Sequence, residues 1–410
     1  MKRVVVTGMG AISPFGKGVD VLMDSLFANE SAVKSVPALA EIGSVRTRVA
    51  AIVPGVDPKE IPRKFRRSMS QMSVYATLAC QEAVAMSHIT EGHCSSGDLG
   101  VSIGSTVGSP IATHAFYKDF LSSTTLDNVR ATMFLQIRSH SCASNVAHVL
   151  GITGRLLAPS SACSTSTQAI GYGYEMIAAG KQDIMLCGGS DEFHLLSAAT
   201  FDIINAASIN YNERPHMTPR PFDVHRDGVV MAEGCGILVL ESFESAVNRN
   251  APILAEVIGF STVTDHVSIA DPNVDSIEIC IRKALLDANI SPHEVHYVNA
   301  HATGTVLGDI AEAGAITRVF GNNIALSSLK GHLGHTMAAS GALETIATIE
   351  MMRRSTLIPT RNLDNIDPLC EGPRFLQNFD KAEIEVAIKN NFALGGVNSC
   401  VVIRRLKNDR

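Results

Sequence analysis

The order of apolar and polar residues predicts strands that alternate with helices along the whole chain. Short runs of aliphatic residues that end at glycine or polar residues are typical of buried strands. Longer segments between them have apolar residues at helical spacing. Predicted strands lie at 4–6, 99–104, 155–158, 183–187, 253–258, 295–299, 324–328, 386–389 and 401–404, and the clearest predicted helices at 168–177, 276–289, 309–320 and 342–354.

The same strand and helix grammar occurs twice, once on each side of residue 250. We therefore predict an α/β protein with covered sheets, made of an N-terminal half at 1–250 and a C-terminal half at 251–410. No low-complexity or proline-rich stretch separates the halves. We expect them to share one core.

Composition narrows the possible classes of protein. The chain has 410 residues, of which 46% are hydrophobic and 18% charged, with a net charge of -6. These values exclude disordered and coiled-coil classes and disfavour a surface built for nucleic acid. Nine cysteines without a Cys-x-x-Cys pair, and no apolar run of membrane-spanning length, predict a cytoplasmic protein that does not enter a membrane.

A glycine-rich segment follows the first predicted strand. Gly8 and Gly10 begin it like a dinucleotide fingerprint, but Ser13 stands where the third glycine is needed. The segment therefore predicts a tight turn rather than a nicotinamide site.

Cys163 has the local setting of a reactive thiol. It lies among small residues, after the predicted strand at 155–158 and before the predicted helix at 168–177. A helix N-terminus favours thiolate, so we expect the pKa of Cys163 to be lowered. The other eight cysteines are interpreted as buried and inert.

Two further loops place titratable side chains at the ends of predicted strands. His301 follows the predicted strand at 295–299, and Lys330 and His335 follow the one at 324–328. Ligands bind outside the carboxyl ends of strands in open α/β sheets, so these residues and Cys163 are expected to share one crevice. Zinc held by His301, His332 and His335 is the alternative, which the nearby Lys330 disfavours.

Several ordered motifs together resemble the β-ketoacyl-[acyl carrier protein] synthase I/II family of condensing enzymes. They lie at 162–166, 220–223, 226–228, 299–305, 330–335 and 395–398. The resemblance implies a thiolase-like fold, with two duplicated halves in a layered αβαβα core. It also implies decarboxylative Claisen condensation of an acyl group with malonyl-acyl carrier protein, in fatty-acid or polyene, aryl polyene or other polyketide biosynthesis.

The family resemblance assigns roles to individual residues. Cys163 would be the nucleophile, His301 and His335 would stabilise the enolate, and Lys330, paired with Glu312, would order the two histidines. The remaining implied roles are an oxyanion hole from the backbone N–H groups of Cys163 and Leu394, and phosphopantetheine binding by Thr303 and Thr305. No tightly bound cofactor is implied, because the substrates are carried on phosphopantetheine.

The acyl pocket departs from the family pattern. Ala302 replaces a usual glycine, while Val229 and Leu394 replace two usual phenylalanines. Val229 and Leu394 are assigned to the acyl pocket and its gate, together with Val107 and the retained Phe392. A less aromatic opening suits a stiff chain, such as a conjugated polyene. The alternative is that neighbouring side chains fill the volume.

The resemblance also implies partners. Lys64 and Arg67, in a basic run, match positions that face the acidic acyl carrier protein, although a solvated helix face is the ordinary meaning of such a run. A homodimer is expected, or a heterodimer with a subunit like a chain-length factor. The set Asn299, Glu344 and Asn390 matches a monovalent-cation site, for which buried hydrogen bonding is the alternative.

A thiolase-like acyltransferase that uses coenzyme A is the competing function. Such an enzyme would use the same cysteine, but a second reactive cysteine would usually replace one histidine. The presence of both His301 and His335 favours condensation.

Overall fold

The computed structural model describes residues 1–127 and 129–406, and its main sheet has twelve strands in two equivalent sets. In each set the first three strands are antiparallel neighbours and the last three are parallel neighbours. The first set is β1 (Val4–Ser13), β8 (Gly234–Ser242), β7 (Ile184–Asp191), β5 (Leu99–Gly104) and β6 (Leu156–Leu157). The second is β9 (Ala255–Thr264), β16 (Val397–Arg404), β15 (Val386–Ala393), β10 (Tyr297–Asn299) and β11 (Ala325–Ser327), with β13 (Arg374–Phe375) beyond it.

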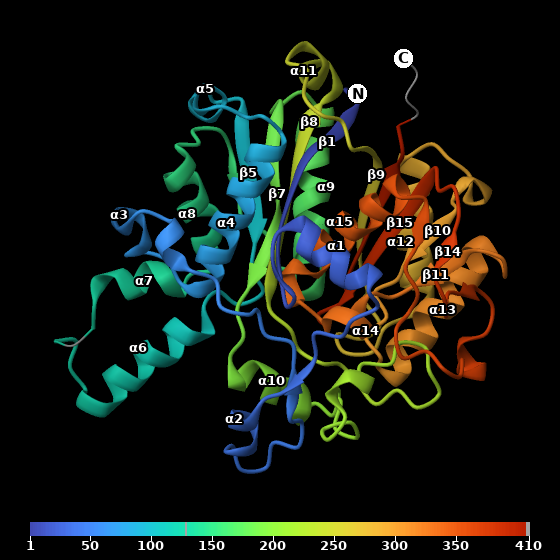
Figure 1. Cartoon of the computed structure of the whole chain (residues 1–410), viewed down its shortest axis with the longest axis horizontal. Helices are drawn as coiled ribbons and strands as arrows, with labels where there is room; N and C mark the ends of the chain where they lie inside the picture. Colours follow the sequence, from blue (N-terminus) through green and yellow to red (C-terminus); the bar gives the residue numbers. More distant parts are fainter. Residues whose placement is uncertain (128, 407–410) are drawn as a thin grey trace.

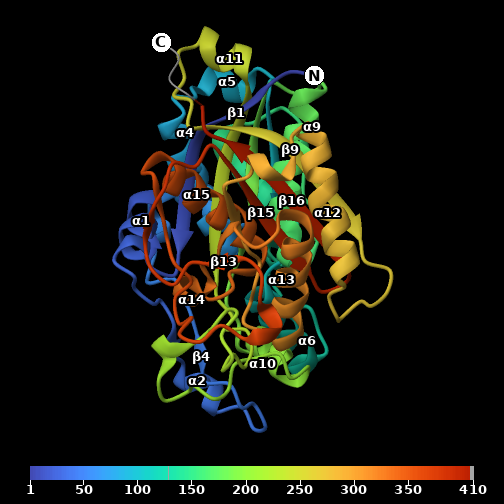
Figure 2. The same cartoon turned by 90° about the vertical axis from the view of Figure 1, so that its right-hand side faces the viewer.

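The two sets join where β1 pairs with β9, and helices cover both faces of each (Figure 1). The outer helices α4 (Gln71–Met86) and α8 (Ser141–Leu150) pack on the first set, and α12 (Val274–Asp287) and α13 (Val306–Phe320) lie at the other side (Figure 2). Between the sets lie α9 (Thr165–Ala178) and α15 (Ser340–Arg353). The predicted five-layered, duplicated α/β architecture is therefore present.

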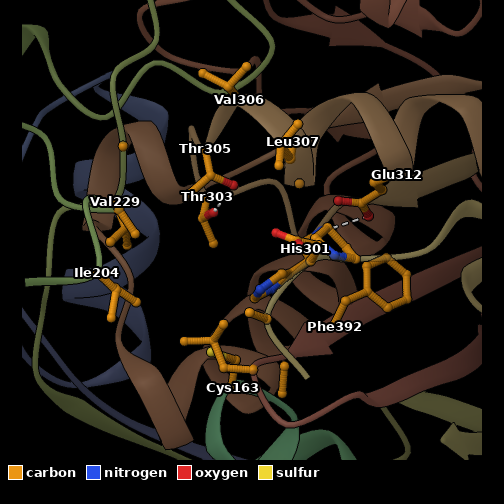
Figure 3. A pocket seen from close by; sticks show the side chains of 18 of the residues that line it. Cys163, Ile204, Val229, His301, Thr303, Thr305, Val306, Leu307, Glu312 and Phe392 are labelled. Atoms are coloured by element: carbon orange, nitrogen blue, oxygen red, sulfur yellow. Dashed lines mark hydrogen bonds between the residues drawn. The ribbon is translucent and has the colours of Figure 1, made fainter. Parts of the chain in front are cut away.

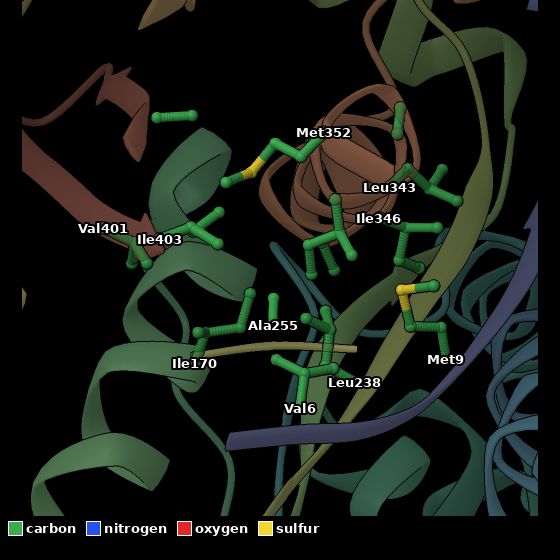
Figure 4. Close-up of a cluster of buried hydrophobic side chains, with 14 of the residues drawn as sticks. Val6, Met9, Ile170, Leu238, Ala255, Leu343, Ile346, Met352, Val401 and Ile403 are labelled. Carbon is green, nitrogen blue, oxygen red and sulfur yellow. The ribbon is translucent and has the colours of Figure 1, made fainter. Parts of the chain in front are cut away.

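The central layer explains why α15 is buried on every side. Its residues from Ser340 to Met352 are all buried, because sheets and α9 surround the helix. Leu343 and Ile346 pack with Val6, Met9 and Leu238 from the strands (Figure 4). Polar residues of this buried helix, such as Glu344, therefore need partners inside the protein.

The remaining elements are shorter or peripheral. They are α1 (Val19–Phe27), α2 (Pro37–Ala40), α3 (Arg63–Arg66), α5 (Glu91–Ser95), α6 (Pro110–Ser123), α7 (Ala131–Ile137), α10 (Leu195–Ile203), α11 (Phe243–Asn248), α14 (Lys330–Leu333), β2 (Gly16–Lys17), β3 (Lys34–Ser35), β4 (Val49–Ala50), β12 (Thr356–Leu357) and β14 (Asp380–Lys381). Within residues 1–127 and 129–406, none of the helices has the length and apolar character needed to cross a bilayer.

The predicted turn at Gly8 and Gly10 is wrong, because β1 continues through both to Ser13. Helix α4 packs so closely on this strand that a Cβ on Gly10 would lie 1.9 Å from the carbonyl oxygen of Ala79. The glycines therefore serve contact between helix and strand, and no phosphate-binding turn forms. Sequence reasoning also missed β8, whereas the other predicted strands and helices are present with shifted ends.

The fold brings two equivalent strand-to-helix connections to one place. One leads from β6 through the 3₁₀ turn Ala162–Ser164 to α9, and the other leads from β11 through α14 and the 3₁₀ turn Met337–Ala339 to α15. Ala162 and Met337, each three residues before its helix, both have a left-handed backbone, with φ of 47° and 53°. Such conformations are costly for residues with a side chain and are concentrated at functional sites.

Candidate active site

A cavity of about 560 Å³ connects the surface to a buried group of Cys163, His301 and His335. These three side chains are nearly inaccessible, whereas Val306 and Leu307, which also line the cavity, are more than half exposed. Figure 3 shows the cavity, with the buried Cys163 at one end and the exposed Val306 at the other. The cavity is thus a blind passage that ends at a thiol.

Cys163 lies directly beside an imidazole, with its Sγ 2.8 Å from Nε2 of His335. Burial raises the pKa of the Cys163 thiol to about 12, although Lys330 and the backbone N–H groups of Cys163 and Leu394 act in the opposite direction. The prediction of a lowered pKa is therefore wrong, because loss of hydration outweighs the helix terminus. The thiol needs a base to become nucleophilic.

His335 can act as that base because it is held neutral. Burial lowers the pKa of its imidazole well below the ordinary value, and the ammonium groups of Lys330 and Lys389 lower it further. A neutral imidazole has one nitrogen free to accept a proton. The Cys163 and His335 pair is thus a thiol beside a neutral base.

His301 faces the same space in a fixed orientation. The backbone N–H groups of His301 and Ala302 both donate to Glu312, at 2.9 and 2.7 Å. The Asn391 amide nitrogen lies 3.1 Å from His301 Nδ1, and the amide oxygen of Asn391 accepts from Thr167. This arrangement makes Nδ1 an acceptor, so the ring proton lies on Nε2. The pKa of His301 is lowered mainly by burial and further by the nearby Lys330 ammonium, which keeps the imidazole neutral.

The predicted pairing of Lys330 with Glu312 is wrong. Lys330 Nζ donates to Glu344 Oε1 at 2.7 Å, with both side chains buried. Glu312 is instead occupied by the two backbone N–H groups of the His301 loop. Buried carboxylates take whichever donors the fold supplies, and the fold places Lys330 beside α15.

The carboxylate of Glu344 also contacts a second lysine. Lys389 Nζ lies 2.5 Å from Glu344 Oε2, and burial lowers the pKa of Lys389 to about 8. Glu344, Asn299 and Asn390 are the set that resembles a monovalent-cation site. Their carboxylate is already neutralised by two ammonium groups, so these residues do not fit an additional bound cation.

His332 is not part of the site. Its Nδ1 and Nε2 each lie 3.1 Å from a backbone carbonyl oxygen, those of Glu30 and Pro359. The three-histidine zinc set is therefore not assembled. Ligand atoms of Cys163, His301 and His335 do lie within 4.8 Å of one another. This spacing suits proton exchange around the thiol as well as it suits metal binding.

Three of the four predicted gate residues line the cavity: Val229, Phe392 and Leu394. Phe392 stands edge-on to His301, and Leu394 is 44% exposed. Val107 does not line the cavity of the single chain and is 68% exposed. It points outward because the preceding loop is tied inward, where Ser105 and the Thr106 N–H donate to Asp191.

The other predicted binding residues fall in two places. Thr303 and Thr305 line the passage between the thiol and the surface, with their hydroxyl oxygens 3.2 Å apart (Figure 3). Lys64, in α3, and Arg67, just after it, are both exposed. Helix α3 packs against α8 and contributes no residue to the cavity lining.

A thiol at a strand-to-helix turn, two neutral histidines and a duplicated αβαβα core define a condensing enzyme of the thiolase-like class. Family models match the chain at residues 1–246, as the β-ketoacyl synthase N-terminal domain, and 254–364, as the C-terminal domain. The chain therefore belongs to the β-ketoacyl synthase family, and it is a ketosynthase, an enzyme of acyltransferase type.

Relatives cover almost the entire chain. The 3-oxoacyl-[acyl-carrier-protein] synthase 1 of Haemophilus influenzae is 32% identical, over 99% of both chains, and that of Escherichia coli K12 is 32% identical, over 99% of this chain and all of the relative. A β-ketoacyl synthase structure from Burkholderia phymatum is 40% identical, with a TM-score of 0.96 over 99% of this chain and all of the other. A type II polyketide acyl-carrier protein in complex with its ketosynthase gives 28% identity and a TM-score of 0.91, again over 99% and 100%.

Sequence reasoning missed Lys389 and Asn391 as parts of the site. A signal was present, since Lys389, Asn390 and Asn391 interrupt an otherwise apolar strand, β15. Three consecutive polar residues in a buried strand need partners, and here those partners are Glu344, Glu312 and His301.

Proposed function

We propose that Cys163, His301 and His335 carry out decarboxylative condensation of an acyl group with malonyl, both delivered on acyl carrier protein. The observation that carries this proposal is the 2.8 Å contact between the Cys163 thiol and His335 at the buried end of the cavity. In this assignment residues 1–250 supply the nucleophile and residues 251–410 supply the histidines.

In the first half-reaction, Sγ of Cys163 attacks the acyl thioester carbon. The sulfur–carbon bond to Cys163 forms, the bond to phosphopantetheine breaks, and the thiol proton passes through His335 Nε2 to the leaving thiolate. The backbone N–H groups of Cys163 and Leu394 are the proposed oxyanion hole, since both hydrogen-bond toward Sγ.

In the second half-reaction, malonyl loses CO₂ and its electron pair remains as an enolate. The Nε2 proton of His301 is one proposed donor to the enolate oxygen, where charge develops. His335 is the other proposed donor, after its ring proton has exchanged from Nδ1 to Nε2 following acylation. The enolate carbon then attacks the acyl carbon, the bond to Cys163 breaks, and a 3-oxoacyl product leaves on the carrier. Glu312 and Lys330 are proposed as positioning residues, since Glu312 holds the backbone of the His301 loop and Lys330 is bound to Glu344.

The passage and its surroundings are proposed to receive the carrier. Thr303 and Thr305 offer hydroxyl groups along the passage for the amides of phosphopantetheine, so no tightly bound cofactor is needed. Lys64 and Arg67 present exposed positive charge to an acidic carrier. Binding of a carrier to a related ketosynthase supports this partner.

We further propose a dimer that is formed at the β6 edge of the sheet. Exposed apolar side chains lie there and on the protruding α6 and α7 segment, among them Leu121, Phe134, Leu135 and Leu156 (Figure 1). A second copy would cover this edge and Val107, whose gate role requires that cover. A related structure combines a ketosynthase with a chain-length factor, so such a subunit is the other proposed partner.

A cytoplasmic location is proposed because all nine cysteines are free thiols. The coenzyme A-dependent alternative is less well supported, because Cys163 is the one cysteine among the residues that line the cavity. The titratable groups nearest to its thiol are His301 and His335, where the alternative would usually have a second cysteine in place of one histidine.

The half-reactions test the assignment. Replacing His301 or His335 by Ala should slow malonyl decarboxylation by roughly 10² to 10³, the usual cost of losing one oxyanion donor. Cys163 acylation should fall less in the His301 variant, whereas the His335 variant should lose acylation as well, because it lacks the base beside the thiol. Intact-mass spectrometry measures acylation, and CO₂ release measures decarboxylation.

Cys163→Ala is the matched control, because alanine fits among small neighbours. It should accept no acyl group while remaining folded. Persistent acylation of this variant would contradict the nucleophile. Equal loss of both half-reactions in the His301 variant would contradict its proposed role, and unchanged acylation in the His335 variant would contradict the role of His335 as base.

A further inference from the structure

Lys389 is a fully buried lysine in the middle of a sheet. Its Nζ lies 2.5 Å from Glu344 Oε2 and donates to the carbonyl oxygens of Asn390, at 2.6 Å, and Ala300, at 3.4 Å. The ammonium group therefore makes one ion pair and two hydrogen bonds with the chain.

The three oxygens around Lys389 belong to a place suited to a monovalent cation. Glu344 and Asn390, with Asn299, form the set that resembles such a site in the sequence. The side-chain oxygens of Asn299 and Asn390 are buried without a hydrogen-bond partner in the described part of the chain. The surroundings are thus rich in acceptors, and the positive charge among them is the chain's own ammonium.

This ammonium ties together the parts that orient His301. Ala300 directly precedes His301, and Asn390 directly precedes Asn391, whose amide contacts His301 Nδ1. Glu344, in α15, also holds Lys330. One charge therefore connects the end of β10, the strand β15 and the central helix α15.

We propose that Lys389 is a positioning residue that replaces a bound monovalent cation in the active site. It balances Glu344 and fixes the backbone on both sides of His301, so that the enzyme needs neither Na⁺ nor K⁺. The charged or titratable groups packed around it are Lys330, Glu344, Glu312, His301 and His335. The inference rests on the proposed role of His301, but the cation dependence of stability tests it without catalysis.

The first experiment exchanges cations on the wild-type enzyme. The thermal midpoint and the condensation rate are measured at constant ionic strength in NaCl, in KCl and in choline chloride, whose cation is too large for a buried site. Both quantities should agree in the three salts. A rate more than twofold lower in choline, or a lower midpoint there, would overturn the proposal.

The second experiment removes the ammonium. Lys389→Ser opens space for an ion, and its condensation rate in choline should fall on the order of 10-fold to 100-fold, since small misplacements of a catalytic group cost this much. Na⁺ or K⁺ should restore much of the loss. Lys389→Met fills the space without charge, and neither cation should rescue it.

Lys381→Ser, at an exposed lysine in β14, is the matched control and should behave as wild type in every salt. A wild-type rate and midpoint for Lys389→Ser in choline would refute the positioning role. If Lys389→Ser folds only with Na⁺ or K⁺, the proposal is supported. If it folds in no salt, the wild-type cation exchange decides. Failure of Cys163 to be acylated in wild type would reject the proposed function and leave the stability test of Lys389 valid.

Discussion

At the scale of single residues, the site operates through neutral forms. Cys163 is a thiol with a raised pKa of about 12, and His335 beside it is an imidazole with a lowered pKa. Burial and the ammonium groups of Lys330 and Lys389 produce this state of the histidine. Nucleophilic thiolate therefore forms only when a substrate is present to receive the proton.

This state predicts how acylation depends on pH. Because the pKa of His335 is lowered, falling pH does not protonate it at the ordinary histidine value, and because the pKa of Cys163 is raised, rising pH does not ionise it early. The single-turnover acylation rate should stay flat from about pH 6 to about pH 8.5, across the unperturbed values of both groups. Rapid-quench intact-mass measurement determines the rate.

His335→Ala provides the control for that profile. Without the base, acylation should be slow and should rise with pH as hydroxide removes the thiol proton. A wild-type rate that falls tenfold per pH unit below about pH 6.5 would show a histidine with an ordinary pKa, contrary to its buried position.

At the scale of elements, helices and strands differ in what they contribute. The ends of β6, β10 and β11 deliver the reacting side chains, α15 supplies Glu344, and β15 supplies Lys389 and Asn391. Helix α3 is remote from the cavity lining but carries exposed positive charge. Its proposed role is therefore in association and can be separated from catalysis.

Charge reversal on this helix tests that role. Lys64→Glu combined with Arg67→Glu should raise the KM for acyl-carrier substrates by about tenfold, mainly through a slower, salt-dependent association. Small pantetheine thioesters should react as before. Initial rates with both substrate types at two salt concentrations provide the measurement, and Lys181→Glu, an exposed lysine after α9, is the control. Equal effects on both substrate types would reduce the basic run to a solvated face.

At the scale of the whole molecule, the shape of the cavity limits which acyl chains can reach Cys163. Val229 and Leu394 line it where the family usually has phenylalanine, and Leu394 is partly exposed at the passage. We propose that these smaller side chains leave a wider opening beside Cys163. We propose that this opening admits stiff acyl chains, such as conjugated polyenes, which cannot bend around a closed gate.

Elongation of saturated and conjugated acyl carriers of matched length tests this substrate class. The wild type should prefer the conjugated chain, and Val229→Phe with Leu394→Phe should reduce that preference by roughly tenfold, within the range set by a change in pocket volume. The ratio of kcat/KM values is the measurement. Equal use of both chains by the wild type would remove the basis of the proposal.

The sequence by itself determined the architecture and the group of side chains that meets at the end of the cavity. Local periodicity and strand-terminal small residues indicate the two β/α halves, and the spacing of the motifs around Cys163, His301, Lys330 and His335 indicates a shared crevice. These features depend on residues close together in the chain. The structure brings Cys163, His301 and His335 together in the cavity, whereas Lys330 does not line it and is buried against Glu344. The sequence did not predict the continuous strand β1, because its glycines are required by close packing against α4, which lies far along the chain.

Only the tertiary structure decided which charges meet. Lys330 pairs with Glu344 rather than Glu312, Lys389 enters the site from a strand interior, and burial raises the pKa of Cys163 against the effect of its helix. Val107 turns away from the cavity because distant Asp191 ties its loop. Partners of buried charges and the loss of hydration depend on residues brought together from distant segments, so local sequence patterns do not encode them.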